Sequence, residues 1–296
     1  MGSLEQAVYA IIISFVIGVI LCPIVIPMLR KLKFGQNVRD DGPQTHLAKQ
    51  GTPTMGGVAF LAAFVITSLF FLKGNRDGAA IMLMTLCYGL IGFLDDYIKV
   101  VKKRSLGLRA YQKLLLQLIF IPFLFVAVLG TVNGVNLTDG LDGLAGGVTL
   151  LVAAFFMIVA WAAGSTIAPV CGAIVGGLMA FLIFNSYPAK VFMGDTGSLA
   201  LGGFVASAAF ILKMPIFIVI VGFIYLWESI SVMLQVGWFK LTKRKYGEGR
   251  RLFKMAPFHH HLEKCGWKET KVVTLFYVAT ALLCLIGFLG CKYMFL

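Results

Sequence analysis

Residues 4–29 read LEQAVYAIIISFVIGVILCPIVIPML, an almost unbroken apolar run with one charged side chain, Glu5. A helix of about 20 apolar residues is long enough to cross the hydrocarbon core of a bilayer. The run begins beside an acidic residue and has no small-residue cleavage site, unlike a secretory signal peptide. We therefore expect it to remain in the protein as the first membrane-spanning helix.

Similar runs follow along the whole chain. Of its 296 residues, 59% are hydrophobic and 13% are charged, whereas soluble domains carry about 25% charged residues. This composition predicts an all-α polytopic membrane protein that forms one integral membrane domain over residues 1–296. Nine apolar runs approach the length of a span: 4–29, 55–72, 79–94, 114–135, 148–163, 168–184, 199–212, 216–236 and 270–289.

The basic residues predict the orientation of these spans. The net charge of +13 would also suit a nucleic-acid-binding protein, but in a membrane protein such an excess usually marks cytoplasmic loops. Lysine and arginine concentrate in residues 30–49, 99–113 and 240–268. We expect these loops in the cytoplasm, both termini outside, and no nucleic-acid partner. The six cysteines are scattered without metal-ligand spacing, so we interpret them as small hydrophobic residues.

Residues 114–135 conflict with this orientation. Lys113 and the stretch from Asn136 are both expected in the cytoplasm, so an even number of crossings must separate them. The run provides roughly 33 Å of helix, which is enough for one crossing. Either the segment is re-entrant and buried in protein, or the chain lacks a segment near Phe120 and Ile121, so that the remains of a fourth and a fifth span are joined. We favour the omission.

Five aspartates fall at the predicted cytoplasmic ends of spans. A carboxylate at the bilayer centre costs roughly 2.5 to 3.5 kcal/mol, so these side chains are not expected to face lipid. They come from three separate parts of the sequence, which the predicted topology brings to one membrane face. The set is Asp95, Asp96, Asp139, Asp142 and Asp195.

The first pair lies in GFLDDYIK, residues 92–99. Adjacent helical positions point about 100° apart, so one aspartate could hold a cation or its water while the other meets substrate. The alternative is a solvated helix end, in which Lys99 is only an ion-pair partner.

The other aspartates lie in two glycine-rich stretches, NLTDGLDG at 136–143 and FMGDTGS at 192–198. If the first stretch is helical, its i,i+3 spacing puts Asp139 and Asp142 on one face, and the glycines let a ligand approach the backbone. The alternative for both stretches is a turn that caps the next helix.

Three further features are open to two interpretations each. KQGTPTMGG at 49–57 suits an anionic oxygen or is a plain loop. The consecutive imidazoles of APFHHHLE, at 256–263, cannot share one helix face, which favours donors to a diphosphate or supporting contacts over a three-histidine metal site. Glu228 shares a helix face with Gln235 inside an apolar run, so it is either functional or makes an interhelical hydrogen bond.

The combination of groups indicates a type of chemistry. Carboxylates gather with lysines and histidines at a cytoplasmic membrane face, and the chain has no G-x-x-x-x-G-K-[ST] motif. Magnesium prefers oxygen ligands and usually binds through one or two carboxylates together with substrate phosphates. The pattern therefore predicts Mg²⁺-assisted phosphoryl transfer at the lipid surface.

Taken in order, GTPTMGG, FLDDYIK, NLTDGLDGLA, FMGDTGS and APFHHHLE closely resemble the motifs of the phospho-N-acetylmuramoyl-pentapeptide translocase family. This family belongs to the polyprenyl-phosphate N-acetylhexosamine-1-phosphate transferase superfamily, and the triple histidine points to the muramoyl-pentapeptide branch. The resemblance runs from about Arg30 to the last span. It implies ten transmembrane helices, a homodimer in the bacterial inner membrane, periplasmic termini and a cytoplasmic-face active site. The chain departs from the family in its shortened fourth and fifth spans.

The same resemblance implies a reaction and its residues. UDP-MurNAc-pentapeptide and undecaprenyl phosphate would yield lipid I and UMP, with Mg²⁺ as cofactor. Asp195 would bind the metal, and the catalytic residues would be Asp95, Asp96, Asp195 and His259. The substrate-binding residues would be Lys49, Thr54, Asn136, Asp139, Gly140, Leu141, Asp142, Asn185, Phe192, Gln235, His260 and His261.

The lipid nucleophile bears on the mechanism. A phosphate monoester with a second pKa of about 6 is largely ionised near neutral pH. We therefore prefer its direct attack on the sugar-bearing phosphorus, with Asp95 deprotonating or orienting it, over a covalent aspartyl intermediate. Two other functions remain as alternatives: a UDP-GlcNAc transferase of the same superfamily, and a transporter, which would place acids near the midplane and on both sides of a pore.

Overall fold

The structure is a computed structural model that describes residues 3–31, 51–101 and 125–291, together with Leu108, Gln112 and Leu115. Every regular element in these residues is a helix, as the sequence predicts. The helices are α1 Ser3–Lys31, α2 Gly57–Leu69, α3 Arg76–Val101, α5 Phe125–Thr138, α6 Leu144–Ala162, α7 Ala168–Asn185, α8 Gly194–Ile211, α9 Phe217–Val221, α10 Phe223–Tyr246, α11 Phe258–Lys264 and α12 Glu269–Cys291.

Six of the described helices are long and apolar enough to cross a membrane, namely α1, α3, α6, α7, α8 and α12. Helix α2 is also apolar but has only 13 residues. The predicted run 216–236 differs from the structure, because the chain breaks at Gly222 into α9 and α10. Glycine is a poor helix former, and here it ends one helix and starts the next.

Small residues bring α1 and α7 into close contact. Gly172 and Gly176 lie one turn apart on α7, and each faces the backbone of α1, at Ala7 and Ile11 respectively. Glycines at this spacing let membrane helices approach closely enough for their backbones to pack. Because both contacts advance in the same sequence direction, α1 and α7 run parallel.

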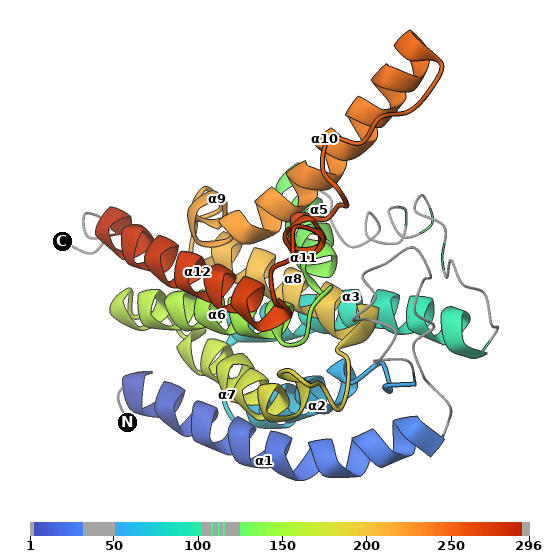
Figure 1. Cartoon of the computed structure of the whole chain (residues 1–296). Coiled ribbons are helices and arrows are strands. Elements are labelled where there is room, and N and C mark those ends of the chain that lie inside the picture. Colours follow the sequence, from blue (N-terminus) through green and yellow to red (C-terminus); the bar gives the residue numbers. More distant parts are fainter. Residues whose placement is uncertain are drawn as a thin grey trace.

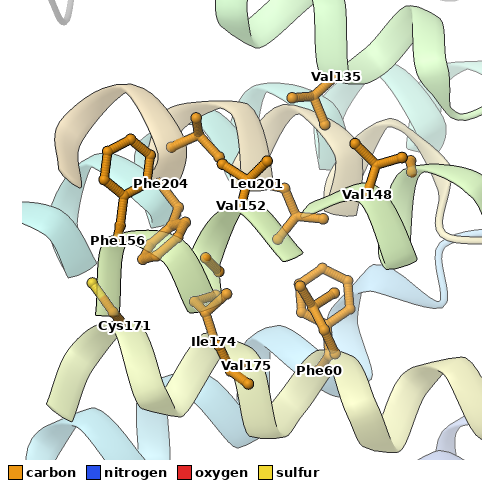
Figure 2. Packing of buried hydrophobic residues seen from close by; sticks show 14 of the residues in the cluster. Phe60, Val135, Val148, Val152, Phe156, Cys171, Ile174, Val175, Leu201 and Phe204 are labelled. Atoms are coloured by element: carbon orange, nitrogen blue, oxygen red, sulfur yellow. The ribbon is translucent and has the colours of Figure 1, made fainter. Parts of the chain in front are cut away.

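The core lies between α6, α7 and α8 (Figure 2). Phe156 of α6, Ile174 of α7 and Phe204 of α8 are fully buried in it. In the apolar windows of α7 and α8, 78% of the residues are buried, compared with 28% in α1 and α12. The two outer helices therefore present most of their apolar side chains outward, as membrane-facing helices do.

The ends of the helices show in which direction each one runs through the bundle. Helices α3, α5 and α7 end, and α6, α8 and α12 begin, at one end of the bundle, which we call the acidic end because it carries Asp95, Asp139 and Asp195. Helix α1 begins and α12 ends at the opposite end (Figure 1). The α3 carboxylates consequently face the start of α8 across an antiparallel helix pair.

Helices α3 and α5 both end at the acidic end although they are consecutive among the described helices. The predicted omission near Phe120 and Ile121 lies outside the described residues and stays a prediction.

Helix α10 extends beyond the other helices (Figure 1). The segment that follows it turns back along the helix: the N–H of Arg250 donates to the Thr242 hydroxyl at 2.8 Å. The N–H groups of Leu252 and Phe253 donate to Oε1 of Gln235 at 3.1 and 2.8 Å. This return leads the chain to α11, which carries the three histidines.

Candidate active site

Three carboxylates from two helices meet at the acidic end. Asp95 and Asp96 lie near the end of α3, and Asp195 lies in the first turn of α8. One oxygen of each carboxylate lies within 4.8 Å of the others. Asp95 and Asp96 are buried, whereas Asp195 is partly exposed. The packing of α3 against α8 thus brings together residues about 100 positions apart in the sequence.

Asp96 caps helix α8. Its Oδ1 accepts a hydrogen bond from the N–H of Asp195 at 3.1 Å, and its Oδ2 accepts from the N–H and the hydroxyl of Thr196 at 2.9 and 2.8 Å. The first N–H groups of a helix have no partner within it, and negative charge is favourable there. Asp96 therefore fixes the start of α8, and with it the position of Asp195.

Asp95 has different partners. The Lys99 ammonium lies 2.6 Å from Oδ2 of Asp95 and 2.8 Å from Oδ2 of Asp195, and the N–H of Leu108 donates to Oδ1 of Asp95 at 2.6 Å. Asn136 of α5 donates to Oδ1 of Asp195 at 2.9 Å. Lys99 therefore pairs not only with Asp95 of its own helix but also with Asp195 of α8, and it joins these two carboxylates.

The helices α3 and α8 touch through their backbones beside this cluster. A Cβ atom at Gly92 would overlap the backbone carbonyl of Asp195 and would lie 2.6 Å from the nitrogen of Thr196. Any side chain at position 92 would have to push α8 away from α3. The glycine therefore sets the spacing between the carboxylates of the two helices.

The stretch after α5 is a turn rather than a helix, from Asp139 to Gly143. The helical condition under which Asp139 and Asp142 would share a face is not met. Asp142 accepts a hydrogen bond from the N–H of Ala189 at 2.9 Å. An aspartate cap, the alternative interpretation, is not found on α6 within the described part of the chain, because Gly143 occupies the N-cap position.

Asp139 faces the carboxylate cluster. Burial raises its pKa to about 8, and the negative charges of Asp195, Asp96 and Asp142 act in the same direction, while a hydrogen bond from the N–H of Gly194 acts against them. Like charges close together disfavour ionisation. Asp139 therefore keeps its proton more readily than an exposed aspartate, and the three carboxylates beside it form the environment that attracts a cation.

The cluster offers only oxygen atoms, which suits a hard cation such as Mg²⁺. Both oxygens of Asp96 are engaged with the start of α8. Asp195, which is partly exposed, is thus the better-placed ligand. The donor set fits magnesium on its chemistry.

The three histidines of α11 turn to three different neighbours. Nδ1 of His259 lies 3.1 Å from Oε2 of Glu228 in α10. His260 contacts a glutamate of its own helix at 2.9 Å, and Nδ1 of His261 accepts a hydrogen bond from the N–H of Lys254 at 3.1 Å. The motif therefore joins α10, α11 and the return segment.

Several predicted substrate-binding residues lie around the loop that precedes α8. The Thr54 hydroxyl is 3.0 Å from where a Cβ atom of Gly194 would lie. Phe192 pairs its backbone with the stretch before α2, donating from its N–H to the carbonyl of Pro53 at 2.9 Å. Asn185 donates to the carbonyl of Val191 at 2.8 Å. These contacts fix the loop that leads to Asp195.

For the remaining predicted residues, the structure describes no direct contact with the carboxylates. Leu141 is buried within the turn, and the described hydrogen bonds of Gln235 are with the return segment rather than with the carboxylates. Lys49 lies outside the described residues, so its role stays a prediction.

Two residues of α12 also hold the turn, and the sequence interpretation missed both. Glu269 accepts a hydrogen bond from the N–H of Asp142 at 2.8 Å, and the Tyr277 hydroxyl donates to the carbonyl of Gly143 at 2.7 Å. The sequence could have indicated Glu269 as a site residue, because it is an acid in the first turn of a helix that follows a basic loop. Tyr277 lies inside an apolar run, and no sequence pattern distinguishes it from the other residues of that run.

Two family models match parts of the chain. Residues 98–213 match glycosyl transferase family 4. Residues 49–61, which precede and begin α2, match phospho-N-acetylmuramoyl-pentapeptide-transferase signature 1.

The chain is also similar over nearly its full length to curated proteins named phospho-N-acetylmuramoyl-pentapeptide-transferase. It is 47% identical to the one of Clostridioides difficile (strain 630), with 98% of this chain and 99% of the relative covered. For Clostridium perfringens (strain 13 / Type A) the identity is 48%, with 96% and 98% covered. For Acetivibrio thermocellus (strain ATCC 27405) it is 46%, with 99% and 98% covered. The C. difficile alignment extends over 325 residues, so that relative has positions without a counterpart in this chain.

Proposed function

Since the chain belongs to the phospho-N-acetylmuramoyl-pentapeptide-transferase family, we propose that it transfers phospho-MurNAc-pentapeptide from UDP-MurNAc-pentapeptide to undecaprenyl phosphate. The products are lipid I, used in peptidoglycan synthesis, and UMP. The observation that carries this function is the cluster of Asp95, Asp96 and Asp195 at one end of an apolar helical bundle. A site placed there can meet a soluble nucleotide and a membrane lipid at the same time.

The proposed location of the acidic end is the cytoplasmic face of the bacterial inner membrane. Basic residues lie in the last turns of α1 and α10, at Arg30 and Lys31 and again from Lys243 to Lys245, and such residues favour the cytoplasmic side. This orientation places both termini outside. The family's ten transmembrane helices and its homodimer complete the proposed architecture.

We propose Mg²⁺ as the cofactor, held by Asp195. Bound there, the ion would offset the negative charge of the transferred phosphoryl group. Lys99 holds the two carboxylates together, and Asp96 keeps α8 in place. The grouping of three carboxylates beside Asp139 supports a cation at this position.

The transfer forms one bond and breaks another. An oxygen of the lipid phosphate bonds to the sugar-bearing phosphorus of the donor, and the bond from that phosphorus to the UMP oxygen breaks. Asp95 orients the lipid phosphate or accepts its remaining proton. Because a phosphate monoester is largely ionised near neutral pH, no covalent aspartyl intermediate is needed.

The proposed donor contacts follow from the family resemblance and from the loops that surround the cluster. The turn after α5, the loop before α8 and the segment before α2 converge on the carboxylates. The family resemblance also implies a role in catalysis for His259, whose buried ring lies between Glu228 and Gly140. The residues proposed to bind substrate are Lys49, Thr54, Asn136, Asp139, Gly140, Leu141, Asp142, Asn185, Phe192, Gln235, His260 and His261.

The test is transfer by the purified protein in lipid nanodiscs that contain undecaprenyl phosphate. With Mg²⁺ and UDP-MurNAc-pentapeptide, lipid I and UMP should form in equal amounts, and EDTA should abolish the reaction. Preference for UDP-GlcNAc would support the superfamily alternative instead. Movement of a nucleotide sugar into sealed vesicles without transfer would contradict an enzyme and support a transporter.

A further inference from the structure

Glu228 of α10 and His259 of α11 form a buried pair. Both side chains have no exposed surface. Nδ1 of His259 lies 3.1 Å from Oε2 of Glu228, and the same oxygen accepts a hydrogen bond from the N–H of Phe258 at 2.8 Å. One carboxylate oxygen thus fixes the start of α11 and the orientation of the imidazole that follows.

The other edge of the imidazole lies against Gly140. A Cβ atom at Gly140 would overlap Nε2 of His259, and the three nearest atoms around that position all belong to this ring. Within the described part of the chain, Nε2 of His259 and Oε1 of Glu228 have no hydrogen-bond partner. A buried polar atom left in this way carries a free-energy cost. A pair that served only to join α10 to α11 would not need to carry that cost, because the Phe258 hydrogen bond already joins them.

The turn that the ring contacts is central to the site. The half with Asp142 and Gly143 is held by Glu269 and Tyr277 of α12. The half with Gly140, beside Asp139 and its cluster of charges, is contacted by His259. Supports from two different helices therefore set the position of the whole turn.

We propose that Glu228 is a positioning residue for the binding of the nucleotide donor. Its carboxylate orients the His259 ring, and the ring holds Gly140 and the turn in the position that the donor requires. The inference rests on the proposed function, which places this turn among the groups that bind the donor. Since Nε2 is covered by Gly140, the effect of Glu228 falls on donor binding more than on the chemical step.

The first test separates positioning from folding. Glu228→Ala should raise the KM for UDP-MurNAc-pentapeptide by about tenfold, in the range of measured couplings between contacting residues, and should leave the KM for undecaprenyl phosphate unchanged. Glu228→Gln should stay near the parent protein, because its amide oxygen can still accept both hydrogen bonds. An equally high donor KM in Glu228→Gln overturns the proposal, and so does a fall in kcat with both KM values unchanged.

The matched control lies one turn earlier on the same helix. Tyr225 is also buried, and its hydroxyl bonds to the hydroxyl of Thr149 at 2.8 Å. Tyr225→Phe removes a buried hydrogen bond of α10 that does not face the turn. Its donor KM should equal that of the parent protein, and a tenfold increase there would assign the effect of Glu228→Ala to general loosening of α10.

A double variant tests whether Glu228 acts through His259. In a His259→Ala background, Glu228→Ala should add nothing further to the donor KM, whereas additive effects overturn the proposal. The affinity for UMP, measured by calorimetry, gives a readout without turnover and should fall about tenfold in Glu228→Ala. A parent protein that binds UMP but makes no lipid I would contradict the proposed function, while the comparison of UMP affinities would still decide the role of Glu228.

Discussion

Asp95 and Asp96 are neighbours in sequence with different surroundings. Asp96 caps α8, whereas Asp95 contacts Lys99 and the N–H of Leu108. Asp95→Asn keeps the size of the side chain but removes its charge and basicity. Lipid I formation should fall by about 10²- to 10⁴-fold, the usual contribution of a general base, while UMP affinity is largely kept. Rapid trapping of a phosphorylated aspartate in the parent protein would contradict direct attack by the lipid phosphate.

The corresponding change at Asp96 provides a comparison at the residue scale. Asp96→Asn replaces a carboxylate that accepts three hydrogen bonds from the start of α8. Loss of a helix cap costs about 0.5 to 2 kcal/mol, so this variant should have a lower Tm than the parent protein. A Tm equal to that of the parent protein would show that the cap is unimportant for stability.

Asp139 predicts a pH dependence of stability. Its pKa of about 8 in the folded protein exceeds the ordinary value of 3.8. Between these values the folded protein holds a proton that the unfolded chain has released, so the stabilisation is present at low pH and fades as the pH rises toward 8. In EDTA, the Tm should fall between about pH 5 and pH 8, and Asp139→Asn should flatten this fall. An unchanged slope in the variant would assign the pH dependence to other groups.

At the scale of elements, the contact between α3 and α8 determines the geometry of the carboxylates. Gly92→Ala would place a methyl group on the backbone of Asp195 and Thr196. Overpacking of this kind typically costs 1 to 3 kcal/mol, and the displaced α8 would carry Asp195 away from Asp95. We expect lower Tm and loss of both transfer and Mg²⁺ binding, measured by thermal unfolding, activity and calorimetry.

Gly130→Ala is the control for this change. Gly130 lies in α5, and apart from its chain neighbours and the backbone of its own helix, no atom of the described residues lies within 4 Å of the position that its Cβ would take. Replacement of a glycine by alanine in such a helical position usually stabilises slightly. The control should keep its activity, and parity between the two alanine variants would contradict a special role for Gly92.

At the scale of the whole molecule, one natural thiol tests the orientation of the bundle. Of the six cysteines, Cys265 is the exposed one, and it follows α11 near the acidic end. A membrane-impermeant maleimide should label it in inverted inner-membrane vesicles and not in intact spheroplasts, with Cys265→Ala as the unlabelled control. Labelling in intact spheroplasts would place the acidic end outside.

The sequence alone predicts the parts of this molecule that depend on local patterns. Hydropathy predicts α1, α6 and α12 to within a few residues, and the alternation of spans predicts that the carboxylates of α3 and α8 gather at one end, as they do. The sequence does not predict the break at Gly222, and it leaves open whether residues 136–143 form a helix or a turn. The position of the turn depends on contacts between helices, such as those of His259 and Tyr277, which no local pattern encodes.

The backbone contact at Gly92 also limits how this protein can evolve. Selection for resistance to a toxic compound usually works by altering side chains that line its binding site. Here the spacing of the carboxylates is set by main-chain atoms and by a position that admits no side chain, while the proposed function requires the carboxylates themselves for turnover. For an antibiotic that binds to Asp95 and Asp195, few mutations would therefore weaken the binding of the drug and still allow the bacterium to grow.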